Sequence, residues 1–81
     1  MRMTMKYLYP RIRDLREDHD MTQAQIAKYL GAGLTQYARY ERGERAIPVY
    51  MLAMLALLYK TSTDYLLGLT NNPKPPEDLP E

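Results

Sequence analysis

Apolar residues recur at helical spacing throughout residues 10–68, and no other feature of the chain restricts its fold as much. They stand three and four residues apart, without the sustained apolar–polar alternation that a half-buried strand requires. Glycine, proline and capping residues divide this stretch into five segments. We therefore predict an all-α fold, a compact domain of five short helices.

Local signals mark the limits of the first two helices. Pro10 suits the first turn of a helix that ends around residues 18–20. Thr22 and Gln25 form the capping-box pattern at the start of the second helix, and Gly31 is a typical glycine stop. The inward positions expected from the spacing are Ile12, Leu15, His19, Ile26, Ala27 and Leu30. Among these, His19 is expected to be packed and hydrogen-bonded.

The other three helices follow the same logic. The third covers about residues 34–41, and Pro48 lies in the first turn of the fourth. The fourth helix is apolar on several sides, so it is either central or has a second apolar side that faces a partner. Thr61 or Ser62 caps the short fifth helix. The inward positions expected here are Tyr37, Tyr40, Leu52, Leu55, Ala56, Tyr59, Tyr65, Leu66 and Leu67.

Composition excludes several classes of protein. The 81 residues contain no Cys and one His, so we expect no disulfide, metal site or cofactor. No apolar stretch approaches the roughly 20 residues that span a bilayer, and the start lacks a signal peptide's apolar core. Acidic residues of the first helix form a solvated face, and no phosphate-binding loop is present. We expect a cytoplasmic protein that is not an enzyme.

The net charge of +1 hides an uneven distribution of charge. Residues 1–68 contain ten basic and seven acidic residues, a net +3, whereas residues 69–81 have a net −2 and four of the six prolines. The sequence predicts a basic domain over residues 10–68 and a mobile, Pro-rich acidic tail over 69–81. Residues 1–9 are expected to form an N-terminal arm. It is either a short strand or a frayed terminus, and the frayed terminus is the favoured prediction.

Residues 22–41 combine a capped helix, a three-residue turn that contains two glycines, and a second short helix. This is the order of a helix-turn-helix motif, whose second helix lies in the major groove of DNA. The motif alone is a weak signal, because any helical hairpin has the same order. The basic residues that follow it, Arg42 and Arg45, strengthen the interpretation.

Four runs occur in order along the chain: RIRDLRED at 11–18, MTQAQIAKYLG at 21–31, YERGER at 40–45 and TDYLLG at 63–68. Together they resemble the phage-repressor, or Cro/XRE-type, helix-turn-helix family. The resemblance implies a lambda-repressor-like domain. It also implies a sequence-specific regulator of transcription, a repressor of bacterial or phage origin, that binds a two-fold double-stranded DNA operator as a homodimer.

Carried over by position, the resemblance makes the following residues face the groove: Leu34, Thr35, Gln36 and Arg39. Arg39 can bind O6 and N7 of guanine together, although a phosphate contact is nearly as favourable. Gln36 can bind adenine or point into solvent. Leu34 can contact only a thymine methyl group.

The resemblance also implies phosphate contacts for Gln23, Arg42, the Gly43 amide and Arg45. The alternatives are a capping or solvated role for Gln23 and a solvated charged loop for the others. It further implies a structural ion pair between Arg16 and Glu41.

Three residues depart from the family pattern. Gly33 stands where a Ser or Thr usually caps the recognition helix, and Leu34 replaces a residue that is commonly polar. Lys60 stands where a glycine often precedes the last helix, which leaves its backbone conformation open.

Apolar residues beyond the expected core suggest a homodimer. They are Met51, Met54, Leu58, Leu66, Leu67 and Leu69. The alternative function is an antitoxin-like or protein-interaction module whose main partner is a protein bound through the tail.

Overall fold

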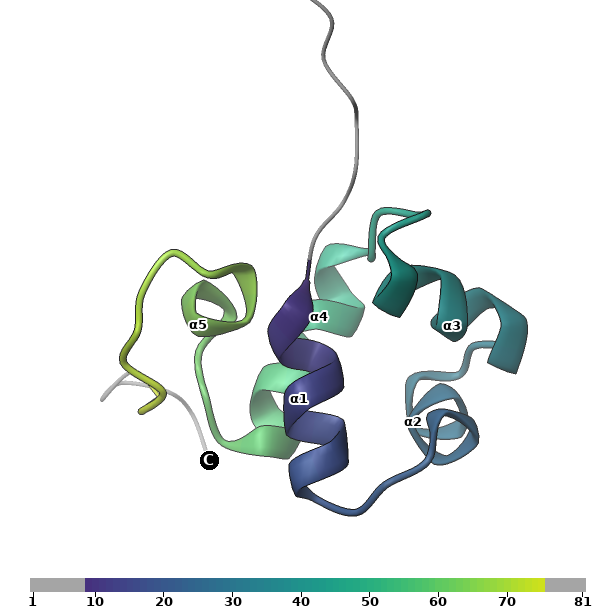
Figure 1. The fold of residues 1–81 in the computed structure, drawn as a ribbon, viewed down its shortest axis with the longest axis horizontal. Helices are drawn as coiled ribbons and strands as arrows, with labels where there is room; N and C mark the ends of the chain where they lie inside the picture. The colour runs from purple at the N-terminus through teal and green to yellow at the C-terminus, as the bar shows by residue number, and fades with distance from the viewer. Residues whose placement is uncertain (1–8, 76–81) are drawn as a thin grey trace, which may run out of the picture.

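The computed structural model describes residues 9–75, which form five α-helices and no strand. The helices are α1 Pro10–Asp18, α2 Gln23–Leu30, α3 Leu34–Arg42, α4 Val49–Tyr59 and α5 Thr63–Leu67. Figure 1 shows α1 in front of α4, with α2 and α3 on one side and α5 on the other. These observations confirm the all-α, five-helix prediction. None of the described helices is long and apolar enough to cross a membrane.

One apolar core joins all five helices. Ile12, Ile26, Tyr37, Leu55 and Leu66 have no exposed surface, and each comes from a different helix. Burial of a large apolar side chain contributes about 1.5–3 kcal/mol, so this cluster holds the short helices together. Most of the other predicted inward positions belong to the same cluster.

Several expected positions differ from the structure. Leu67 was expected in the core but is 41% exposed, and Tyr65 is only half-buried. Conversely, Met51, which is expected at a dimer surface, is buried in the core, and Leu66 takes the core role rather than the dimer role expected for it. The reason is that α4 is apolar on all sides and α5 is a single turn and a half, so spacing alone does not select their inward face.

The helix ends follow the sequence signals closely. Thr22 and Gln25 form both bonds of the capping box, and Ser62, rather than Thr61, caps α5. Pro48 lies one position before α4 rather than in its first turn. His19 is exposed at the end of α1, so the prediction of an inward position was wrong, but its ring Nδ1 does lie 2.8 Å from the Leu15 carbonyl.

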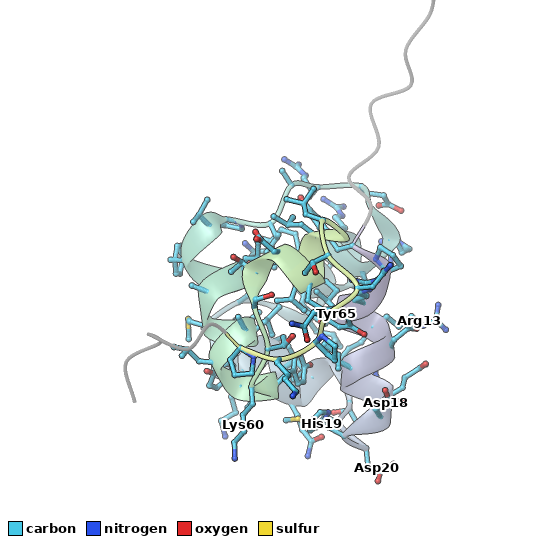
Figure 2. The ribbon with its side chains drawn as sticks, turned by 90° about the vertical axis from the view of Figure 1, so that its left-hand side faces the viewer. Arg13, Asp18, His19, Asp20, Lys60 and Tyr65 are labelled. Atoms are coloured by element: carbon cyan, nitrogen blue, oxygen red, sulfur yellow. The ribbon has the colours of Figure 1, made fainter. Side chains whose placement is uncertain are left out.

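Lys60 ends α4 in the left-handed backbone region with a φ of 55°. Figure 2 shows its side chain at the same end of the molecule as His19 and Asp20. Asp20 also has a positive φ, of 56°, which was not predicted from the sequence. Asp tolerates this region better than Lys because its short side chain can hydrogen-bond locally.

Residues 69–75, the described part of the expected tail, are bound by the side chains of Arg11 in α1 and Thr61 before α5. Arg11 donates to the carbonyl of Tyr65 at 2.8 Å, to the carbonyl of Thr70, and to Asn71 Oδ1 at 2.8 Å. Its guanidinium lies 3.9 Å from the centroid of the Tyr65 ring. Figure 2 shows the yellow C-terminal segment crossing the side that carries Tyr65.

The Thr61 hydroxyl also holds this segment, because it donates to the Pro73 carbonyl at 2.7 Å. The role of Arg11 was not predicted, since no local signal in a sequence indicates a partner 60 residues away. The division of the chain near residue 68 stays a prediction. Residues 1–8 of the expected arm and residues 76–81 of the expected tail lie outside the described residues.

Candidate nucleic-acid interface

Helix α3 has one buried side and one exposed side. Tyr37, Ala38 and Tyr40 are buried against the core. The residues predicted to face the groove are all exposed: Leu34, Thr35, Gln36 and Arg39. The apolar positions therefore hold α3 on the domain, while the four predicted groove-facing side chains remain open to a ligand.

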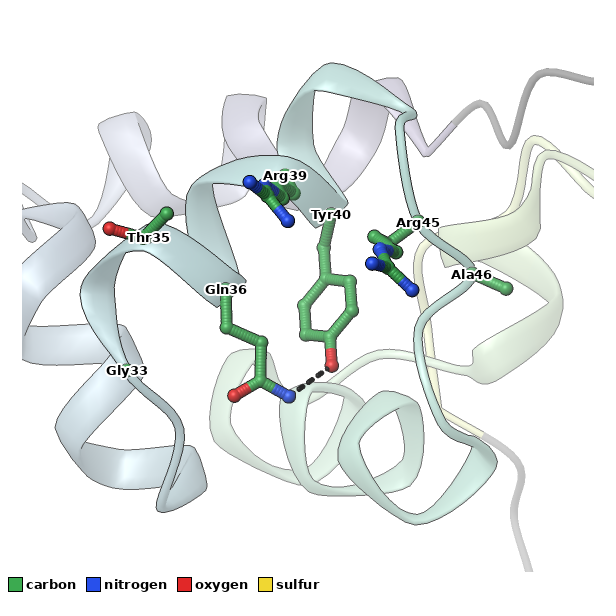
Figure 3. Close-up of a pocket in the computed structure, with 7 residues that line it drawn as sticks. All are labelled: Gly33, Thr35, Gln36, Arg39, Tyr40, Arg45 and Ala46. Carbon is green, nitrogen blue, oxygen red and sulfur yellow. Dashed lines mark hydrogen bonds between the residues drawn. The ribbon is translucent and has the colours of Figure 1, made fainter.

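An open hollow of about 590 Å³ lies between α3 and the loop that follows it. It is lined by Gly33, Thr35, Gln36, Arg39, Tyr40, Arg45 and Ala46. Figure 3 shows Arg39 and Arg45 on opposite sides of Tyr40, one from α3 and the other from the loop. The fold thus brings predicted base-reading residues next to one predicted phosphate contact, Arg45.

Gln36 is exposed, but part of its hydrogen-bonding capacity is already used within α3. Its Nε2 donates a hydrogen bond to the Tyr40 hydroxyl at 2.7 Å. The two residues are four apart, so they share one side of α3. That spacing was visible in the sequence, but Tyr40 was considered there only as a core residue.

The other predicted phosphate contacts have partners within the domain. Arg42 Nε and Nη2 donate to Glu44 at 2.7 and 3.2 Å, and about half of each side chain is exposed. The Gly43 amide donates to the Tyr40 carbonyl at 3.2 Å as the left-handed cap of α3. Gln23 Nε2 donates to Glu41 Oε1 at 3.0 Å. Contact with DNA would require sharing or exchange of these bonds.

Arg16 and Glu41, which the family resemblance paired, join α1 to the end of α3. Arg16 Nε lies 2.7 Å from Glu41 Oε2, and Nη2 lies 3.2 Å from Oε1. The third guanidinium nitrogen donates to the Met21 carbonyl at 2.9 Å. The side chains are 12% and 3% exposed, so the pair is largely withdrawn from water. Such two-point geometry fixes the relative placement of the two helices.

Burial acts to raise the pKa of Glu41, but hydrogen bonds, that from Arg16 foremost, leave the pKa below its usual value. The same pair raises the pKa of Arg16. Burial, and then the Glu41 carboxylate, raise the pKa of Tyr37 well above its usual value. Among residues 9–75 the Tyr37 hydroxyl has no partner with regular hydrogen-bond geometry, so Glu41 acts on it through its negative charge.

Among the described residues, no group of three His, Asp or Glu side chains is placed to hold a metal ion. The surface around α3 instead offers hydrogen-bond donors and positive charge. Arg39 and Arg45 supply guanidinium groups that can bind a base edge or a phosphate. This chemistry is that of a nucleic-acid contact surface.

Residues 12–66 match the helix-turn-helix family model. The match covers most of the chain, which therefore belongs to the helix-turn-helix family, in agreement with its resemblance to the Cro/XRE-type members. Matching residues run from α1 through α5, so they include both the motif and the helices that support it.

Relatives from Bacillus subtilis (strain 168) carry the same kind of domain. The chain is 42% identical over 65 residues to the uncharacterized HTH-type transcriptional regulator YobD, covering 80% of this chain and 58% of that protein. It is 38% identical over 58 residues to the HTH-type transcriptional regulator ImmR, covering 72% and 46%. It is 40% identical over 58 residues to the HTH-type transcriptional regulator AnsR, covering 72% and 50%. The chain spans about half the length of these relatives.

Proposed function

We propose that this chain is a sequence-specific, double-stranded DNA-binding regulator of transcription that inserts α3 into the major groove. The observation that carries the proposal is the exposure of Leu34, Thr35, Gln36 and Arg39 beside Arg45, on a helix whose other side is fixed in the core. Relatives named as HTH-type transcriptional regulators support it. Placement of a recognition helix in this way is the established docking mode of helix-turn-helix domains.

Within this proposal, the exposed residues have separate roles. Arg39 binds a guanine edge, Thr35 and Gln36 contact neighbouring bases, and Leu34 contacts a thymine methyl group. Arg45 binds a backbone phosphate directly. Arg42 becomes available when phosphate replaces its bond to Glu44, which is exposed and therefore weak enough to exchange. Gln23 and the Gly43 amide complete the phosphate contacts by sharing donors.

The chain acts as a homodimer on a two-fold operator, because one short recognition helix makes few contacts. The half-sites lie about one helical turn, roughly 34 Å, apart. Val49, Tyr50 and Leu57 form an exposed apolar surface on α4, hereafter the α4 surface, and provide the dimer contact. A bound dimer would exclude other proteins from the same DNA, which favours repression. The site of action is the bacterial cytoplasm, on the nucleoid or phage DNA.

Selection of binding sites from random duplex DNA tests the proposal. We expect one enriched two-fold motif for the full chain. Arg39→Ala should relax preference at one base pair per half-site by about 10-fold or more. Arg45→Ala should weaken binding to all DNA sequences alike. It should also reduce the slope of log K against log salt by about 0.9 for each phosphate that is no longer neutralised. Arg13→Ala, which removes an exposed arginine of α1 paired with Glu17, is the matched control. Recovery of no motif would refute the proposal.

A second candidate function is a protein-interaction module whose partner binds the Pro-rich tail, and the acidic residues at its end, Glu77, Asp78 and Glu81, favour it. The discriminating variant ends at residue 75, because Arg11 and Thr61 bind residues 70–73 and should keep their partners. A DNA-binding regulator should keep its affinity for DNA after this truncation. Loss of a co-purifying protein with no change in DNA binding would favour the second function.

A further inference from the structure

Tyr40 combines a fixed ring with a hydroxyl at the hollow. The residue is 4% exposed and belongs to the core cluster. Its ring meets that of Tyr37 edge-on, with centroids 6.4 Å apart and planes at 84°. A ring packed in this way has little rotational freedom, so its hydroxyl is a fixed hydrogen-bond acceptor at the hollow.

The hydroxyl holds Gln36 in one orientation. Gln36 Nε2 donates to it at 2.7 Å, and Figure 3 shows the carbonyl oxygen of Gln36 pointing away from Tyr40. A primary amide has two N–H hydrogens, of which this bond uses one. The carbonyl oxygen and the second hydrogen have no other partner among residues 9–75, and Gln36 is exposed at the hollow.

An amide edge with one acceptor and one donor side by side matches adenine. Adenine offers the N6 amino group as donor and N7 as acceptor in the major groove, and a glutamine amide can pair with both. Guanine offers two acceptors there, and cytosine offers a donor without the adjacent N7. The amide left by Tyr40 therefore favours adenine over the other bases.

We propose that Tyr40 is a positioning residue for base recognition, which orients the Gln36 amide so that it reads one adenine in each half-site. The inference rests on the proposed DNA-binding function and deepens it. A free glutamine side chain loses rotamer freedom when it binds a base, whereas one already held by a fixed hydroxyl loses less. Preorganisation of this kind increases discrimination without adding a contact between Tyr40 and DNA.

The test is site selection from random duplex DNA with the full chain and the variants Tyr40→Phe, Gln36→Ala and the double variant. Tyr40→Phe removes only the hydroxyl. The matched control is Tyr29→Phe, which removes another tyrosine hydroxyl bond, 2.9 Å to the Met54 carbonyl, away from the hollow. Affinity for random DNA and thermal unfolding are measured for every variant, so that a general loss of binding or folding is seen separately.

We expect the full chain and Tyr29→Phe to enrich adenine at one position of each half-site. Gln36→Ala should lose that preference by about 10-fold or more. Tyr40→Phe should reduce the preference for adenine at the same position roughly 3- to 10-fold and leave the affinity for random DNA unchanged. In the double variant, Tyr40→Phe should cause no further loss of preference beyond that of Gln36→Ala.

Two results would overturn the inference while leaving DNA recognition intact. One is a Tyr40→Phe variant that keeps the full adenine preference although Gln36→Ala loses it. The other is a motif that Gln36→Ala leaves unchanged. If the full chain enriches no motif at all, the proposed function fails, and this inference fails with it.

Discussion

At the scale of single residues, the notable charge is Glu41, a carboxylate on the helix that we propose to lie nearest DNA. Arg16 and Gln23 both donate hydrogen bonds to this carboxylate, and Arg16 balances its charge. The repulsion between Glu41 and a DNA phosphate is thereby reduced. Gln23 thereby has a structural role beside the phosphate contact proposed for it. The residue types are visible in the sequence, but only packing brings these three residues, each from a different helix, together.

Glu41→Gln should lower the free energy of unfolding by roughly 3 kcal/mol at pH 7, because it leaves the largely buried Arg16 guanidinium without a counter-charge. Urea unfolding measures the loss. The control is Glu17→Gln, which breaks an exposed pair with Arg13 and should cost less than about 1 kcal/mol.

The same variant gives a test by pH. The pKa of Glu41 is lower in the folded state than its ordinary value of 4.5, so folding gains stability from this group above that value. The gain disappears as the pH falls through the lowered pKa, because the carboxylate then becomes protonated in both states. The difference in unfolding free energy between wild type and Glu41→Gln should therefore shrink below about pH 4.5. A constant difference from pH 7 to pH 3 would contradict this role.

At the scale of elements, local capping chemistry explains most helix limits. Thr22, Ser62 and the glycines at the ends of α2, α3 and α5 act through neighbours a few residues away. Several other ends lack the favoured residue, and two of them invite substitution. Helix α3 begins at Gly33 without a side-chain cap, and α4 ends at Lys60 in the left-handed region.

Gly33→Ser should stabilise the domain by about 0.5 kcal/mol, since a hydroxyl there can accept from an unpaired amide of the first turn and reduces the freedom of the unfolded chain. The backbone at Gly33 is extended, and a new Cβ would have open space. Gly31→Ser is the matched control, because it also has open space but a φ of +73°. It should destabilise by about 1 kcal/mol. Thermal unfolding measures both changes in stability. If both variants were stabilised, or both destabilised, the explanation by backbone conformation would be wrong.

Lys60→Gly should stabilise the domain by about 0.5–1 kcal/mol, because glycine adopts a φ of 55° without the steric cost of a Cβ. Lys60→Ala keeps the Cβ and should show no such gain. Chemical unfolding of the two variants separates backbone strain from loss of the lysine charge. Equal stabilities of the glycine and alanine variants would show that the left-handed turn costs nothing here.

At the scale of the whole molecule, α4 contributes residues both to the core and to the proposed dimer contact. Its inward side supplies Leu55 and Met51 to the core, while Val49 is 82% exposed and Tyr50 is 61% exposed. A helix that is apolar all round suits a position between the core and a second subunit. The exposed apolar residues of α4 are therefore better assigned to pairing than Met51 and Leu66, which are buried in the core.

Leu57→Glu should dissociate the dimer and weaken binding to a two-half-site operator by at least about 10-fold, because a charge buried at a subunit contact has no partner. The chain should stay folded, since Leu57 is 52% exposed in the single subunit. Sedimentation measures the oligomeric state and circular dichroism the fold. Leu69→Glu, at an exposed leucine outside the α4 surface, should leave the dimer intact. Dissociation by Leu69→Glu alone would place the contact at the C-terminal end of the domain.

The exposed set on α3 came from the family resemblance, whereas local signals in the sequence predict the five helices and many of their caps. These depend on interactions between residues a few positions apart, which a sequence displays directly. Three features depend on tertiary packing instead: the side of α4 that is buried, the hold of Arg11 on residues 70 and 71, and the hydrogen bond between Gln36 and Tyr40 at the hollow. An apolar helix has no preferred face, and a polar side chain no preferred partner, until packing brings neighbouring elements within reach.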